Sequence, residues 1–127
     1  MPPRKFLVDR RGASFLIGLI VGAAIWWLSP LITGRREPWD AGSGYYEGAL
    51  LGAGVLGGLL LPEHSRWFVA GIFVGQVLVL LGAVLTEPSS GGLWPLGVVF
   101  LALYSLLALL GATLGSGLRR LRRRRTP

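Results

Sequence analysis

One stripe of small and apolar residues occurs twice along this chain, each time inside a long apolar segment. Its members alternate at spacings of three and four, which places them on one face of a helix. They are Phe15, Gly18, Gly22, Ile25 and Ser29, followed fifty-three residues later by Phe68, Gly71, Gly75, Leu78 and Gly82. In water, a glycine inside a helix costs about 1 kcal/mol relative to alanine. In lipid, small residues four apart let two helix backbones pack closely. The stripes therefore predict a membrane protein whose helices contact one another.

Composition supports lipid as the solvent. Of the 127 residues, 52% are hydrophobic and only 15% are charged, against about 25% charged in an average soluble protein. A chain of this size cannot hide so much apolar surface in a core of its own. The sequence has no cysteine and one histidine, so it predicts no disulfide, no catalytic thiol, no metal site and no cofactor.

Four segments are apolar enough to cross a membrane, which takes about 20 residues per helix. They are residues 14–32, 45–61, 67–85 and 95–117. Short polar connections make successive helices antiparallel. The sequence thus predicts an all-α membrane protein, a single integral membrane domain over residues 1–127 with four transmembrane helices in an antiparallel bundle. The second segment is the weakest of the four, because it is short and rich in glycine.

Basic residues predict the orientation. They gather in the tails, residues 1–13 and 118–127, and only Arg35 and Arg36 fall on the opposite side of the predicted spans. Because basic flanks mark the cytoplasmic side, both termini are expected in the cytoplasm. The composition favours a bacterial inner membrane. Tyr45 and Tyr46 begin the second segment, where aromatic side chains usually anchor a helix at the interface.

Glycine pairs four residues apart occur in every predicted helix, and we expect them to be helix-packing positions. They are Gly18 and Gly22, Gly48 and Gly52, Gly54 and Gly58, Gly71 and Gly75, and Gly111 and Gly115. A second match joins residues 49–53 to residues 108–112, which share the string Ala-Leu-Leu-Gly-Ala. Together the matches favour a duplicated two-helix hairpin, although low-complexity apolar sequence also produces such matches by chance.

Gln76 is the only strongly polar side chain near the middle of a predicted span. An amide there either hydrogen-bonds to a neighbouring helix or contacts a ligand. Ser105 and Thr113 on the last segment are its possible partners, or else they bond back to their own helix, and Tyr104 is a further possible polar contact. No Asp, Glu, Lys, Arg or His lies deep in a span. Proton-coupled pumps normally keep such a group there, so that class is disfavoured.

Two charged regions are candidates for contact with partners. The first connection is a possible docking loop for a partner protein, or else an interfacial anchor, through Arg35, Arg36, Glu37, Trp39 and Asp40. The last tail is expected to contact anionic lipid headgroups through Arg119, Arg120, Arg122, Arg123, Arg124 and Arg125. Each basic residue beside a span gains about 1 kcal/mol near an anionic surface. No aromatic residues interleave with these arginines to stack bases, so nucleic acid is not an expected partner.

The leading functional hypothesis is a small non-catalytic multi-pass membrane protein, an accessory or scaffold subunit in a homo-oligomer or a larger membrane complex. It follows from the glycine faces, the absence of buried charge and the absence of a catalytic set. The alternative is an oligomeric channel or transporter for a neutral or weakly polar solute, lined by Gln76, Tyr104, Ser105 and Thr113. An enzyme is not expected, because no acid, base or metal ligands converge.

Overall fold

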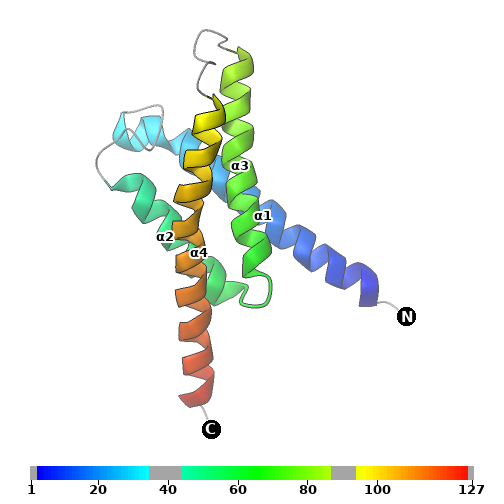
Figure 1. Ribbon diagram of the computed structural model, residues 1–127. Coiled ribbons are helices and arrows are strands. Elements are labelled where there is room, and N and C mark those ends of the chain that lie inside the picture. Colours follow the sequence, from blue (N-terminus) through cyan, green and yellow to red (C-terminus); the bar gives the residue numbers. More distant parts are fainter. Residues whose placement is uncertain (1–2, 35–43, 87–93, 126–127) are drawn as a thin grey trace.

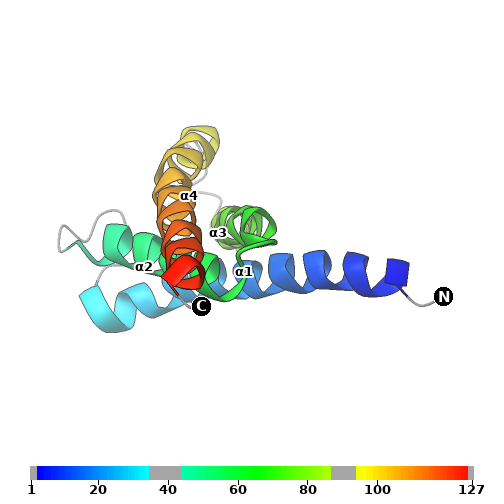
Figure 2. The ribbon, with the colours of Figure 1, turned by 90° about the horizontal axis from the view of Figure 1, so that it is seen from below.

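The computed structural model describes residues 3–34, 44–86 and 94–125, and the regular structure of these residues is entirely helical. The helices are α1 (Pro3–Thr33), α2 (Tyr45–Leu60), α3 (Ser65–Thr86) and α4 (Trp94–Arg125). Successive helices run in alternating directions and cross obliquely (Figure 1). Seen from below, α1 runs along one edge of the molecule, and α3 and α4 lie on the same side of it (Figure 2). The predicted all-α class is confirmed.

Three helices contain stretches that are long and apolar enough to cross a membrane. These stretches are Arg10–Ser29, Ser65–Thr86 and Pro95–Arg124. The helix α2 has 16 residues, a length of about 24 Å at 1.5 Å per residue, and is shorter than a hydrocarbon core of about 30 Å. Both end helices continue beyond the predicted spans, because α1 begins at Pro3 and α4 ends at Arg125. Much of each basic tail is therefore helical.

Local chemistry explains where the helices end. Gly34 follows α1 with φ 75° and Gly44 precedes α2 with φ 78°. This is the left-handed conformation that glycine adopts without steric cost. After α2 the chain turns tightly at Pro62, which cannot continue the helix. The Leu61 N–H donates to the Gly57 carbonyl (2.7 Å), and the His64 N–H donates to the Leu61 carbonyl (3.1 Å).

The helices α1 and α3 form one of the two most extensive pairs, and they meet backbone to backbone. A Cβ on Gly18 would lie 2.0 Å from the carbonyl oxygen of Phe68, and a Cβ on Gly71 would lie 2.0 Å from that of Phe15. These contacts are reciprocal. Gly18 and Gly71 are equivalent positions of the two stripes, as are Phe15 and Phe68, and each glycine contacts the phenylalanine of the other stripe. The residue numbers rise together along both helices, so the pair is parallel.

The helices α2 and α4 form the other extensive pair, with the same kind of contact. A Cβ on Gly54 would lie 2.1 Å from the carbonyl oxygen of Ala108, and a Cβ on Gly111 would lie 2.3 Å from that of Leu51. This pair is also parallel, and its contacts are reciprocal at an offset of fifty-seven residues. The string shared by residues 49–53 and 108–112 has a different offset. Its Gly52 has no atom within 4 Å of a built Cβ.

The contacts of the helix α3 generate a matched pair of substitutions. A methyl group on Gly75 would lie 2.2 Å from the carbonyl oxygen of Leu19, whereas Gly82 has open space. We expect Gly75→Ala to lower the free energy of unfolding by about 1–3 kcal/mol, the usual cost of overpacking. Gly82→Ala should leave it unchanged or raise it slightly, because alanine is the better helix former. Unfolding followed by circular dichroism in a mild detergent measures both. Equal stability of the two variants would contradict the close packing of α1 on α3.

Candidate functional site

Gln76 lies on α3 directly after Gly75, on the face that packs into the molecule. Its side chain is fully buried. Because Gly75 has no side chain, the helix α1 approaches α3 closely here, with the Leu19 carbonyl against Gly75. Burying an amide without hydrogen-bond partners costs free energy, so the partners of the Gln76 side chain show whether it has a structural role.

The amide of Gln76 makes hydrogen bonds to all three other helices. Its Oε1 accepts from the Trp26 Nε1 on α1 at 3.1 Å and from the Tyr46 hydroxyl on α2. Its Nε2 donates to the Ser105 Oγ on α4 at 3.4 Å and to the carbonyl of Ile72, one turn earlier on α3, at 3.3 Å. A side-chain amide offers two donors and two acceptor sites, and all four are used. We call Gln76, Trp26, Tyr46 and Ser105 the polar hub.

Aromatic rings close the space around the polar hub. The rings of Trp26 and Tyr46 meet edge to face, with centroids 6.5 Å apart and an interplanar angle of 87°. The Tyr104 ring also lies against the Tyr46 ring, with centroids 4.7 Å apart. Such pairs add stability beyond the area that they bury. In the part of the chain that the structure describes, every buried side-chain nitrogen and oxygen has a hydrogen-bond partner.

Two predicted polar residues therefore lie at the hub and one lies apart from it. Ser105 bonds to Gln76, and Tyr104 contributes its ring. Thr113 is exposed, and its hydroxyl donates to the carbonyl of Leu109 on its own helix at 2.9 Å. This bond satisfies the hydroxyl without another helix.

Sequence reasoning missed Trp26 and Tyr46. Tyr46 begins an apolar segment, and we expected it at the membrane interface as an anchor, but its side chain is fully buried. The signal that distinguishes it from Tyr45 is helical phase. The buried face of α2 includes Tyr46, Leu50, Gly54 and Gly58. Tyr45 lies beside that face, is half-buried, and donates from its hydroxyl to the carbonyl of Ile25 at 2.8 Å.

The glycines expected at helix interfaces fall into two groups. The larger group lies against the backbone of another helix of the same chain: Gly18, Gly22, Gly54, Gly58, Gly71, Gly75, Gly111 and Gly115. The other pair, Gly48 and Gly52, has no atom within 4 Å of a built Cβ. Both of its members lie on an exposed face of α2.

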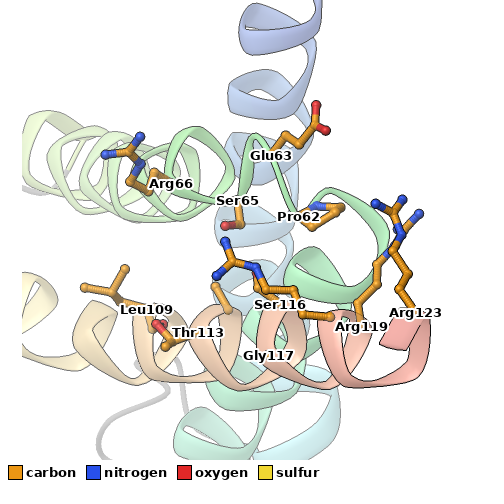
Figure 3. A pocket seen from close by; sticks show the side chains of 12 residues that line it. Pro62, Glu63, Ser65, Arg66, Leu109, Thr113, Ser116, Gly117, Arg119 and Arg123 are labelled. Atoms are coloured by element: carbon orange, nitrogen blue, oxygen red, sulfur yellow. The ribbon is translucent and has the colours of Figure 1, made fainter. Parts of the chain in front are cut away.

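A cleft of about 840 Å³ opens at the end of α4, beside the turn between α2 and α3 (Figure 3). We call it the basic cleft. It is lined by Pro62, Glu63, Ser65, Arg66, Leu109, Ala112, Thr113, Ser116, Gly117, Arg119, Arg120 and Arg123. A second cleft of about 390 Å³ adjoins it and shares Arg119 and Arg123. Thus three of the arginines expected at lipid headgroups line one hollow, together with Arg66 from α3.

The other charged candidates are placed differently. Arg122 and Arg124 are exposed and do not line the basic cleft. The predicted docking loop, Arg35, Arg36, Glu37, Trp39 and Asp40, lies outside the described residues. Within the described ranges, no group of three or more His, Cys, Asp or Glu side chains is placed to hold a metal ion.

Comparison of the chain with protein-family models, with curated proteins and with solved structures finds no match.

The polar hub generates the second prediction. We expect Gln76→Leu to lower the free energy of unfolding by about 1–3 kcal/mol, because the Trp26 Nε1 and the Tyr46 hydroxyl lose their acceptor inside the molecule. The matched control is Thr113→Val, which removes an exposed hydroxyl bonded only to its own helix and should cost less than about 0.5 kcal/mol. Thermal unfolding in a mild detergent measures both. A Gln76→Leu protein as stable as the unsubstituted chain would contradict the hub.

Proposed function

We propose that this chain is a non-catalytic integral membrane protein, an accessory or scaffold subunit that packs against copies of itself or within a larger membrane complex. The observation that carries the proposal is the closed interior. All four hydrogen bonds of the Gln76 amide are made within the chain. At eight interface glycines, the backbone of another helix of the same chain occupies the space that a side chain would need. Such an interior favours a rigid unit whose interactions take place on its outer surface.

The outer surface is strongly apolar. Large side chains more than half exposed include Leu31, Leu85, Trp27, Leu60 and Ile20. Exposed apolar patches of this extent mark contact with lipid or with another protein. Within that surface, Gly48 and Gly52 on α2 provide the kind of small-residue face at which a helix from another subunit packs closely. We infer that α2 is the fourth span, and that its short length is compensated where it packs against α4 and a neighbouring subunit.

We further infer that both termini lie in the cytoplasm of a bacterium and that the helices cross its inner membrane as an antiparallel bundle. The arginines on α4 and the α2–α3 turn are then on the cytoplasmic side, where anionic lipids attract them. The reciprocal contacts in both parallel pairs favour an origin by duplication of a two-helix hairpin, with a pseudo-twofold axis along the membrane normal.

A solute path through the polar hub is the weaker alternative. Gln76, Tyr104 and Ser105 do lie together, as such a path requires. However, a solute that contacted the Gln76 amide would have to displace a hydrogen bond already made, and no described cleft contains this residue. If the path existed, Gln76→Leu would abolish flux into liposomes at unchanged protein content.

Native mass spectrometry in a mild detergent tests the scaffold proposal. We expect a defined oligomer or a stable complex with a co-purifying subunit. Gly52→Leu should reduce that assembly because its side chain blocks the open face of α2. Gly82→Leu fills open space on α3 and should leave the assembly intact. A strictly monomeric protein with no co-purifying partner would overturn the proposal.

Cysteine labelling tests the orientation without background, because the chain contains no cysteine. A membrane-impermeant maleimide should label Ser90→Cys in intact cells. It should label Pro2→Cys and Thr126→Cys only after the membrane is permeabilised, because both tails are rich in the basic residues that remain in the cytoplasm. Labelling of the two ends on opposite sides would contradict the proposed topology.

A further inference from the structure

The basic cleft and the adjoining cleft meet at Arg119 and Arg123, near the C-terminal end of α4. Both arginines line the basic cleft and the adjoining cleft of about 390 Å³. The two residues are four apart and therefore lie one above the other on the same face of the helix. Figure 3 shows both side chains rising from α4 toward the turn that contains Pro62 and Glu63.

The position of Arg119 is fixed by the helix α2. Its Nη1 donates to the carbonyl of Leu59, in the last turn of α2, where backbone carbonyls lack partners within the helix. This bond holds one guanidinium at the wall of the cleft. A basic group held in place loses less conformational entropy when it binds an anion than a fully mobile one.

The charge of the basic cleft is strongly positive. Four arginines line it, Arg66, Arg119, Arg120 and Arg123, against one carboxylate, Glu63. The N-terminus of α3 opens onto the same hollow at Ser65, whose side chain points toward α4 in Figure 3. A helix N-terminus adds positive potential, although the N–H groups of Trp67 and Phe68 already donate to the His64 carbonyl. The combination suits a phosphate group.

Toward the middle of α4 the floor of the same cleft is apolar, with Thr113 beside it and Arg66 above it (Figure 3). It is lined by Leu109 and Ala112 on α4, and the Leu109 side chain is 42% exposed. A hollow that passes along one helix from arginines to an apolar wall matches a molecule with a phosphate at one end and hydrocarbon at the other. A free phosphate ion would use only the basic end.

We propose that the basic cleft is a discrete site for one anionic phospholipid. Arg119, Arg120 and Arg123 hold its phosphate, with Arg66 at the rim, and an acyl chain lies against Leu109. The site rests on the membrane placement proposed above, because the α3 span begins at Ser65 and the arginines must then lie at headgroup depth. Bound there, the lipid joins the α2–α3 turn to α4.

The test uses the full-length protein, delipidated in a neutral detergent and titrated with phosphatidylglycerol, phosphatidylcholine or inorganic phosphate. Native mass spectrometry counts bound lipids, and thermal unfolding reports stabilisation. We expect one tightly bound phosphatidylglycerol and a raised melting temperature, and weaker binding of phosphatidylcholine. Inorganic phosphate should neither stabilise the protein comparably nor displace the lipid at equal concentration.

Two double variants distinguish binding at the basic cleft from a general attraction of anionic lipid to the positive charge of α4. Arg120→Gln with Arg123→Gln removes two arginines of the cleft and should weaken phosphatidylglycerol binding at least about tenfold. Arg122→Gln with Arg124→Gln removes the same charge from the same turns of α4 outside the cleft. Its effect should stay below about threefold in physiological salt, which screens exposed charges. The melting temperatures without lipid show that both variants fold.

Equal weakening by the two double variants, or phosphate binding without preference for lipid, would overturn the lipid site. Either result leaves the scaffold proposal standing, because assembly is read from the protein subunits in the same spectra. Conversely, a monomeric protein that still binds one phosphatidylglycerol overturns the scaffold and supports the site.

Discussion

Close contact between helix backbones is the interaction on which the rest of this structure depends. Within lipid, helices gain little by exchanging lipid contact for apolar protein contact, so van der Waals packing and hydrogen bonds must hold them. At Gly18 and Gly71, the carbonyl oxygen of the facing helix occupies the space that a Cβ would need. The same is true at Gly54 and Gly111. Each pair of helices is therefore in contact only because both of its members provide glycine at reciprocal positions.

The polar hub connects the two helix pairs that the glycine contacts form. The glycine contacts build two pairs, α1 with α3 and α2 with α4, and contacts between the pairs are less extensive. Gln76 on α3 accepts hydrogen bonds from α1 and α2 and donates one to α4. These directional bonds need specific partners, so they fix how one pair sits against the other in a way that apolar contact does not. The hub thereby converts two helix pairs into one unit.

The sequence predicted the helical class and four spans. The class and three of the spans are confirmed, because both depend on composition and periodicity within a single segment. It also predicted Gln76 and Ser105 as partners, since few polar side chains lie in the spans. It did not predict Tyr46, because an aromatic residue at the start of a segment fits an interfacial anchor equally well until neighbouring helices are placed. It did not predict Trp26, because an apolar run does not show which of its aromatic side chains faces a polar group on another helix. The string at residues 49–53 also does not identify the contacting positions. Matching letters do not show which helix face is buried, and the contacts of α2 with α4 follow a different offset.

Neutral polar groups lie in the interior and charged groups lie at one end of the helices, and these two regions have different roles, rigidity and binding. In the interior, neutral polar groups satisfy one another, so this region contributes rigidity. At the end that contains the α2–α3 turn, Arg119 is partly held by the Leu59 carbonyl, while Arg120 is exposed. A substitution in the interior should therefore act on stability first. A substitution among the exposed arginines should act on binding with little cost to the fold, and this difference makes the two kinds of role separable by experiment.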